Sequence, residues 1–315
     1  MRNWAVGLLL CVCLAPRAFG WGDDGHKAIN RVAAGRIPAS MPAFLQKAGA
    51  RLEYLGPEPD RWRGPQEFAL KEAQEPDHFI NLERLADLPE LPPGRYEFYR
   101  LLYEKRAALA RQQKADGGPA TGTLEPDDFL PERVGLQPYI VMEVYGRLKT
   151  AFREYRYLKA ARQNTEAVEQ NIVFYMGWLG HYVGDAANPL HTTVQYNGWI
   201  GPNPHGYTTG HQIHWQMETQ FVTANLAQLQ FGDLVKAPVR LDDPWPAYLA
   251  YLRHSHTLVE RCYELEKAGG FIGAGTAEAR QFIRHRLAAG AQMLVNLWYT
   301  AWMESDVPPA ATPRN

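Results

Sequence analysis

Two pairs of a histidine and an acidic residue, each four positions apart, are the strongest chemical signal in this chain. They are His181 with Asp185, and His214 with Glu218. Residues four apart lie on one face of a helix, so each pair can present two ligands to one metal ion. An isolated pair of this kind is more often a simple ion pair, so the interpretation depends on the residues around it.

The surroundings of His181 favour a metal ligand. Residues 173–185 read Val-Phe-Tyr-Met-Gly-Trp-Leu-Gly-His-Tyr-Val-Gly-Asp, which is apolar almost throughout. Burying an imidazole and a carboxylate in such a segment is costly unless they have a partner, and a metal ion is an efficient partner.

Further candidate ligands lie outside the two pairs. His191 follows Pro189, which we expect to end the helix and turn a third ligand back towards the site. Asp60 and His78 lie in segments that we expect to be loops, where catalytic groups are often displayed. The remaining histidines of the mature chain fit no such pair, and we expect them at the surface or among charged helix positions: His205, His211, His254, His256 and His285.

The first twenty residues have the three-part layout of a secretory signal. A basic residue near the start precedes an apolar run over residues 5–14, and small residues lead up to Gly20. The run is about half the length that a membrane-spanning helix needs, so we expect cleavage before Trp21 and export to the periplasm or the medium. The mature chain then begins with a free α-amine that can bind a metal beside His26.

Composition limits the class of the mature protein. Two of the three cysteines lie in the leader, at Cys11 and Cys13, so only Cys262 remains and no internal disulfide can form. An exported chain without disulfides needs a large core or bound metals. The mature chain would carry 31 Lys and Arg against 34 Asp and Glu, a formal net charge of −3, since two of the 33 basic residues lie in the leader. This balance is unlike the strongly basic surface that grips duplex nucleic acid, and no later segment is long and apolar enough to span a membrane.

Apolar residues recur at helical spacing through most of the chain, while signals for strands are weak. We therefore expect an all-α single-domain helical bundle over residues 21–305, with a surface loop at 113–133 and a disordered tail at 306–315. The expected helices span residues 26–37, 96–112, 138–162, 165–186, 208–230, 246–268 and 276–305.

The order of these residues resembles that of the trinuclear zinc phosphodiesterases, the superfamily of zinc-dependent phospholipase C and the single-strand-specific extracellular nucleases, and points to a bacterial exported member. The resemblance runs from Trp-x4-His at Trp21, through Asp60 and His78-Phe79, to His-x3-Glu ending at Glu218. Its most specific part is the block Gly-His-Tyr-Val-Gly-Asp-x4-Leu-His, which ends at His191.

This resemblance implies three Zn²⁺ ions, and imidazole and carboxylate ligands suit zinc well. The implied ligands are Asp60, His78, His181 and Asp185 for one ion; the Trp21 amine and carbonyl, His26 and the bridging Asp185 for a second; and His191, His214 and Glu218 for a third.

The resemblance also implies a mechanism. Paired zinc ions lower the pKa of bound water, and the resulting hydroxide attacks phosphorus. Asp60 would orient this nucleophile or accept its proton. Arg63 would clamp the phosphate through two oxygens, although a solvated loop arginine is the simpler alternative for this residue.

The substrate is left open between two branches. Phe79 stands where the nucleases place a base-stacking ring, which favours a single-strand-preferring nuclease or nucleotidase that releases 5′-phosphorylated products. Asn81 stands where those nucleases have an acid that reads the base, and Glu218 is the carboxylate found in the phospholipase branch. The alternative is therefore a secreted phospholipase C that binds phospholipid head groups, and a second alternative is a non-enzymatic zinc-stabilised protein. None of these implies a stable protein partner.

Overall fold

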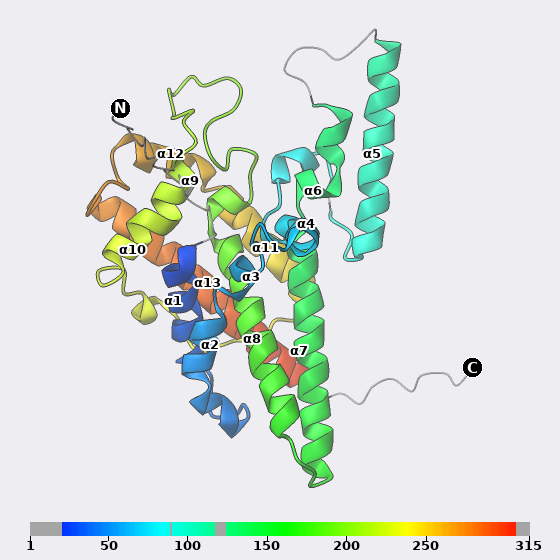
Figure 1. Cartoon of the computed structure of the whole chain (residues 1–315), viewed down its shortest axis with the longest axis vertical. Coiled ribbons are helices and arrows are strands. Elements are labelled where there is room, and N and C mark those ends of the chain that lie inside the picture. The colour runs from blue at the N-terminus through cyan, green and yellow to red at the C-terminus, as the bar shows by residue number, and fades with distance from the viewer. Residues whose placement is uncertain (1–20, 89, 117–123, 307–315) are drawn as a thin grey trace, which may run out of the picture.

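The computed structural model describes residues 21–88, 90–116 and 124–306, and its centre is the helix α8 (Glu166–Ala187). Four helices pack around α8: α1 (Gly22–Ala34), α2 (Gly49–Leu55), α7 (Gln137–Ala160) and α13 (Ala277–Glu304). In Figure 1 α7, α8 and α13 run through the middle of the molecule, and α1 and α2 cover one side of them. The all-α architecture predicted from the sequence is confirmed.

Small residues on α8 allow this close packing. A Cβ atom on Gly177 would lie 2.3 Å from Cβ of Leu55, and one on Gly180 would lie 1.9 Å from Oδ1 of Asn30. The Asn30 side chain uses the space to donate hydrogen bonds to the carbonyls of Leu52 and Gly177. Because α1, α2 and α8 are held this tightly, the side chains that they carry towards the site have little freedom.

The other helices are short or peripheral. They are α3 (Glu58–Arg61), α4 (Phe68–Gln74), α5 (Arg95–Ala115), α6 (Pro131–Val134), α9 (Ile213–Trp215), α10 (Val222–Asn225), α11 (Pro244–His256) and α12 (Val259–Lys267). Tight 3₁₀ turns lie between them, at Ala43–Lys47, Glu75–His78, Leu82–Leu85, Pro126–Phe129, Pro189–His191 and Gly232–Leu234. Within the described ranges there is no strand, only an isolated bridge between Tyr196 and Gly198.

Several expected boundaries were wrong. The helix expected at 208–230 begins only at Ile213 and changes into a π-helical turn, Gln216–Phe221, before α10. The helix expected at 246–268 is two helices, α11 and α12, which meet at Leu258 with a backbone φ of −101° and ψ of 4°. No Gly or Pro marks this break. After the break, α12 buries a face of its own that includes Val259, Cys262 and Leu265.

Two segments expected to be loops carry helical turns instead. Asp60 lies on α3, and His78 ends the 3₁₀ turn Glu75–His78. The expected surface loop at 113–133 contains the end of α5, a 3₁₀ turn and α6. Prolines near the starts of these turns set the backbone for a helical turn, whereas the composition alone suggested irregular chain.

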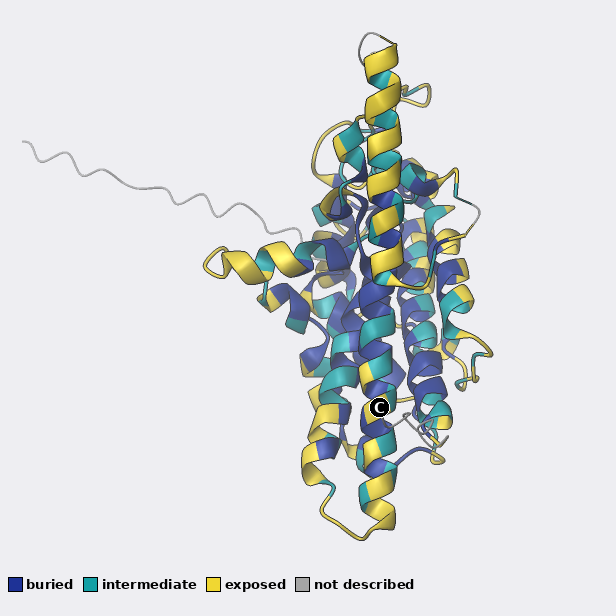
Figure 2. Cartoon of the chain, turned by 90° about the vertical axis from the view of Figure 1, so that its right-hand side faces the viewer, coloured by how far each residue is buried: buried dark blue, intermediate teal, exposed yellow. Residues whose placement is uncertain are grey.

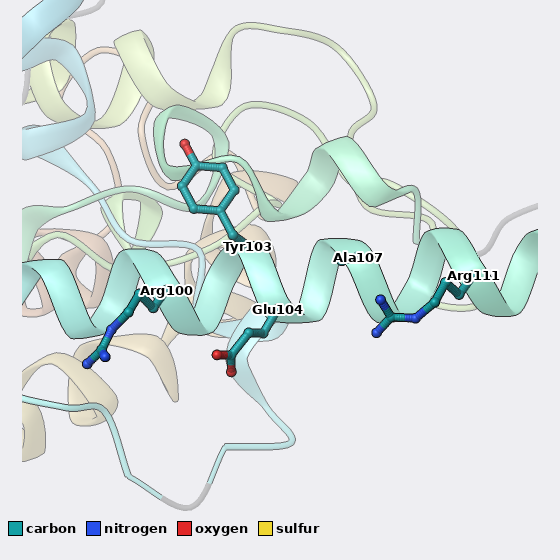
Figure 3. A pocket seen from close by; sticks show the side chains of 5 residues that line it. All are labelled: Arg100, Tyr103, Glu104, Ala107 and Arg111. Atoms are coloured by element: carbon teal, nitrogen blue, oxygen red, sulfur yellow. The ribbon is translucent and has the colours of Figure 1, made fainter.

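Helix α5 extends beyond the body of the protein and is exposed along most of its length (Figures 1 and 2). Only Phe98 and Leu102 on this helix are buried. Its outer face has a shallow hollow that contains no histidine and lies between Arg100, Tyr103, Glu104, Ala107 and Arg111 (Figure 3).

None of the described helices is both long and apolar enough to cross a membrane. Cys262 is buried, and burial raises the pKa of its thiol, which agrees with a packing role. The predicted leader with Cys11 and Cys13, residues 117–123 of the predicted loop, and residues 307–315 of the predicted tail lie outside the described residues.

Candidate metal centre

The histidines and acids singled out from the sequence come together at one end of α8. Within the described part of the chain they form three buried groups, and in each group the candidate ligand atoms lie within 4.8 Å of one another. The groups are His26, His181 and Asp185; Asp60, His78 and His181; and His191, His214 and Glu218. All eight residues were predicted as ligands from the sequence.

Asp185 lies at the centre of the first two groups and is fully buried. Its Oδ1 is 3.3 Å from Nε2 of His26, and its Oδ2 is 3.1 Å from Nδ1 of His78 and 3.3 Å from Nε2 of His181. Asp60 approaches the same two imidazoles from α3, with Oδ1 3.9 Å from Nδ1 of His78 and 3.8 Å from Nε2 of His181. One carboxylate can therefore serve two groups.

Backbone carbonyls set the orientation of three imidazoles. Nδ1 of His181 is 2.9 Å from the carbonyl oxygen of Gly56, and Nδ1 of His191 is 2.7 Å from that of His78. Nδ1 of His214 is 3.0 Å from the carbonyl oxygen of Tyr196. A carbonyl only accepts hydrogen bonds, so each Nδ1 carries a proton and each Nε2 is turned towards its group.

The Nε2 atoms oriented in this way lie close to other polar atoms of the site. Nε2 of His191 lies 3.2 Å from Nε2 of His214, and Nε2 of His214 lies 2.9 Å from Oε2 of Glu218. Nε2 of His181 lies 3.1 Å from Nδ1 of His78. Unprotonated nitrogens at these distances repel one another unless a cation lies between them. In tetrahedral zinc sites with bonds of 2.0–2.1 Å, ligand nitrogens are roughly 3.3 Å apart, so the donor sets fit a metal ion.

The electrostatics of the groups agree with this fit. Burial lowers the pKa of His78 and of His214 to about 4, so both rings are neutral near pH 7. Burial raises the pKa of Asp60 to about 7 and that of Glu218 to about 8. Burial opposes the ionisation of Asp185 too, but the histidines around it hold its pKa well below the usual range. The neutral rings of His78 and His214, beside the acids Asp60 and Glu218 that resist ionisation, form a site that a divalent cation would stabilise.

Trp21 and His26 reach the site from the start of α1. The Trp21 side chain is fully buried, and its indole nitrogen donates a hydrogen bond of 2.7 Å to the carbonyl of Gly184, next to Asp185. The carbonyl of Trp21 accepts a bond from the amide of Gly25. Both ring nitrogens of His26 are buried and form no hydrogen bond of good geometry within the described residues, although Nε2 faces Oδ1 of Asp185, and the ring stacks on His181 at 4.0 Å. Ligation by the Trp21 amine stays a prediction.

Two residues that the sequence analysis did not single out support the ligands. Nδ2 of Asn188 donates a bond of 2.9 Å to Oε2 of Glu218, while its Oδ1 accepts from the amide of Leu190. Gln74 contacts Nε2 of His78 at 3.1 Å. The Asn-Pro dipeptide at Asn188 was a signal for a turn, but nothing in the sequence connects either amide side chain with a distant acid or histidine.

A cleft of about 560 Å³ opens onto the groups from the side of α4 and is partly lined by His78, His191 and His214. Arg63 lines the cleft with its side chain only 16 % exposed, and its Nη1 is 3.3 Å from Oδ1 of Asp60. Its Nη2 is 3.4 Å from Oε1 of Glu75. The geometry places Arg63 between an acid of the site and the cleft, which differs from a solvated loop arginine.

The two residues predicted to contact substrate also line this cleft. Phe79 is half-buried there, and Asn81 is buried. Nδ2 of Asn81 already donates a bond of 2.8 Å to the carbonyl of Arg133, which fixes the direction in which its amide points.

The charges of the lining are mixed. Its glutamates are Glu72, Glu75 and Glu132, its arginines are Arg63, Arg84 and Arg133, and Tyr196 adds a second aromatic ring to that of Phe79.

The other histidines lie outside the three groups. His205 and His211 are exposed, and Nε2 of His205 is 3.6 Å from Oε1 of Glu260. His254 and His285 are also exposed, while His256 is half-buried with Nδ1 3.4 Å from the hydroxyl of Thr192. None of these five histidines belongs to the three groups found among the described residues.

No protein-family model matches this chain, and no curated protein matches it. Among solved structures it is similar to the alpha-toxin of Clostridium perfringens from an avian strain, with 11% sequence identity and a TM-score of 0.41. The similarity covers 92% of this chain and 65% of the toxin chain, so the chain spans less than two thirds of the toxin's length. At this level the similarity is too low to support an inference about function.

Proposed function

We propose that this protein is a zinc-dependent hydrolase that cleaves phosphodiester bonds. The observation that carries the proposal is the close approach of imidazole nitrogens in two places. Nε2 of His191 lies 3.2 Å from Nε2 of His214, and Nε2 of His181 lies 3.1 Å from Nδ1 of His78. The proposal is also supported by the open cleft beside them and by Arg63 at its wall, since a guanidinium suits two phosphate oxygens.

Three zinc ions, one for each group, suit the ligand chemistry. The donors are imidazoles and carboxylates with no thiolate among them, a set that zinc binds well. We propose that Asp185 bridges the first two ions and that the Trp21 amine completes the ligands around His26. The group of His191, His214 and Glu218 has only three protein ligands, which leaves a position open for substrate or water.

Bound zinc would supply a hydroxide near neutral pH and a positive charge for the phosphate oxygens. Arg63 would hold the phosphate at the mouth of the site, because its guanidinium already lies between Asp60 and the cleft. Oδ2 of Asp60 is buried and has no hydrogen-bond partner among the described residues, so this oxygen is available to orient the nucleophile or to take its proton.

The cleft favours glycerophospholipid over nucleic acid as the substrate. Its glutamates Glu72, Glu75 and Glu132 offset its three arginines, so the lining lacks the excess of positive charge that the repeated phosphates of a polynucleotide call for. The same carboxylates, with the rings of Phe79 and Tyr196, suit a cationic head group attached to a single phosphate. Glycerophospholipid is thus the preferred substrate and nucleic acid the alternative, whereas the sequence favoured nucleic acid.

A single-strand nuclease or nucleotidase is the second candidate. Phe79 lines the cleft beside His78, where a ring could stack on an unpaired base. Because Asn81 is buried and its amide is held by the carbonyl of Arg133, such an enzyme would read little of the base edge. A non-enzymatic zinc protein is less well supported, because structural zinc sites are closed by four protein ligands, whereas these groups line an open cleft.

We also propose export to the periplasm or medium, with residues 21–305 acting as one domain. These proposals rest on the pattern of the leader and on the continuous helical packing around α8.

The experiment that tests the proposed function uses the full chain, exported and processed in a bacterial host. We expect three zinc ions per chain by elemental analysis and turnover of bis-p-nitrophenyl phosphate that a chelator abolishes and zinc restores. The purified protein should then release diacylglycerol from phosphatidylcholine vesicles faster than it cuts single-stranded DNA. Bound zinc without turnover of any phosphodiester would support the non-enzymatic alternative instead.

A further inference from the structure

The orientation of His78 has a different origin from that of the other imidazoles described above. His181, His191 and His214 each donate Nδ1–H to a backbone carbonyl. In His78 it is Nε2 that points away from the group, and it lies 3.1 Å from Oε1 of the Gln74 side chain. A side chain, which can be exchanged by mutation, thus takes the role that the backbone has elsewhere.

The local hydrogen bonds decide which way the Gln74 amide points. Nε2 of Gln74 donates a bond of 3.2 Å to the carbonyl oxygen of Pro59, which can only accept. Oε1 must therefore face His78, and on that side the hydroxyl of Tyr182 is also within 3.5 Å of it. With Nε2–H donated to Oε1, the lone pair of Nδ1 faces the Asp185 carboxylate at 3.1 Å, an arrangement that a cation between the two would make favourable.

We infer that Gln74 is a positioning residue, which makes Nδ1 of His78 the atom that binds the metal. This inference rests on the proposed zinc site. Without an acceptor at Oε1, the ring of His78 can place its proton on either nitrogen, and the fraction with Nδ1 free falls. Loss of such a supporting partner typically lowers metal affinity by about 10- to 100-fold.

Gln74 also connects the two segments that supply this group. It ends α4, its amide nitrogen binds Pro59 on α3, and Pro59 precedes Asp60. Gln74 is only 6% exposed, so its bonds do not compete with bulk water. The Gln74 side chain thus makes two kinds of contact: it accepts a hydrogen bond from His78, and it donates one to the segment that carries Asp60. Mutation can separate the two.

Two substitutions separate these functions. Gln74→Leu removes both bonds, whereas Gln74→Glu keeps an acceptor for His78 and loses the donor to Pro59. The control is Asn296→Leu, because Asn296 is similarly buried at 8% and its Oδ1 accepts only from the Val239 amide and the Gln292 side chain, away from the three groups. Zinc affinity is measured on the folded, processed protein by competition with a chromogenic chelator, and folding is checked by circular dichroism.

We expect Gln74→Leu to weaken the binding of one zinc by about 10- to 100-fold and Gln74→Glu to restore affinity to within a few-fold of wild type. Asn296→Leu should leave zinc affinity unchanged. Unchanged affinity in Gln74→Leu, or an equal loss in both Gln74 variants, would overturn the inference while leaving the zinc site intact. A wild-type protein that binds no zinc would overturn the site and the inference together.

A measurement on the wild type does not depend on the variants folding. In zinc-loaded protein labelled with ¹⁵N-histidine, the nitrogen shifts should show His78 coordinated through Nδ1 and protonated at Nε2. Coordination through Nε2 would refute the role of Gln74 directly.

Discussion

Nε2 of His191 and Nε2 of His214 lie 3.2 Å apart, although they come from segments 23 residues apart in the chain. The two rings are turned towards each other because each uses Nδ1 for a backbone carbonyl, of His78 and of Tyr196. The backbone thus imposes a contact that is unfavourable in the absence of a cation. Stability and metal binding should therefore be coupled in this protein.

Asp185 should be the most sensitive residue of the site, because its two oxygens face ligands of two different groups. We expect Asp185→Asn to lose at least one zinc per chain, to lose nearly all turnover and to unfold at a lower temperature than wild type. Elemental analysis and thermal unfolding of the purified variant check this. Asp233→Asn, which removes only an exposed ion pair with Arg284, is the control. Unchanged zinc content in Asp185→Asn would refute the bridging role.

Stability of the zinc-free protein should fall as the pH rises from 6.5 to 8. Burial raises the pKa of Glu218 to about 8 in the folded state, so the folded protein holds a proton there that the unfolded chain has already lost. When the unfolded state binds fewer protons, stability decreases with pH. The buried neutral rings of His78 and His214 act in the opposite sense, but mainly below pH 6.5.

The expected loss from Glu218 over this window is about 1 to 2 kcal/mol. Urea unfolding of the chelator-treated protein at several pH values measures it, and Glu218→Gln should flatten the dependence. Saturating zinc should reduce it as well, because the bound ion keeps the carboxylate ionised. A zinc-free protein that is more stable at pH 8 than at pH 6.5 would contradict this account.

The length of the mature N-terminus should matter for zinc binding. Trp21 is held by its buried indole beside Gly184, so an additional residue before it would place a peptide bond where the free amine is expected. We expect a chain that retains Gly20 to bind fewer zinc ions and to be less active. Mass spectrometry of the exported protein, combined with zinc analysis, tests this. Full activity in a chain with a different terminus would show that the amine is not a ligand.

The long helices and the two helical pairs of candidate ligands could be predicted from the sequence because both have local signatures, whereas Asp60 and His78 were candidates mainly through the family resemblance. The apolar run before His181 predicts a buried α8, and the spacings of His181 with Asp185 and of His214 with Glu218 predict shared faces. The π-helical turn that carries Glu218 could not be predicted in this way. It has no residue signature of its own, and π-helical turns are frequent at functional sites.

The roles of Gln74 and Asn188 could not be predicted either, for a different reason. Each acts on a ligand through one hydrogen bond, and its role depends on which donors and acceptors the tertiary fold brings to its two ends. A glutamine at the end of a short helix has the same local sequence signal whether it is solvated or supports a metal ligand. Only the position of the Pro59 carbonyl fixes the direction of the Gln74 amide.

Phe79 should contribute to the choice of substrate. If its ring contacts a cationic head group, Phe79→Ala should lower kcat/KM for phosphatidylcholine by about 2- to 30-fold, the range that corresponds to a cation–π contact of about 0.5 to 2 kcal/mol. Phosphatidylglycerol, whose head group has no cation, and bis-p-nitrophenyl phosphate should be much less affected. Assays of both lipids in matched mixed micelles measure the difference. An equal loss on the two lipids would rule out the head-group contact. If instead the wild-type enzyme prefers single-stranded DNA and the Phe79→Ala variant does not, base stacking and the nuclease candidate would be established.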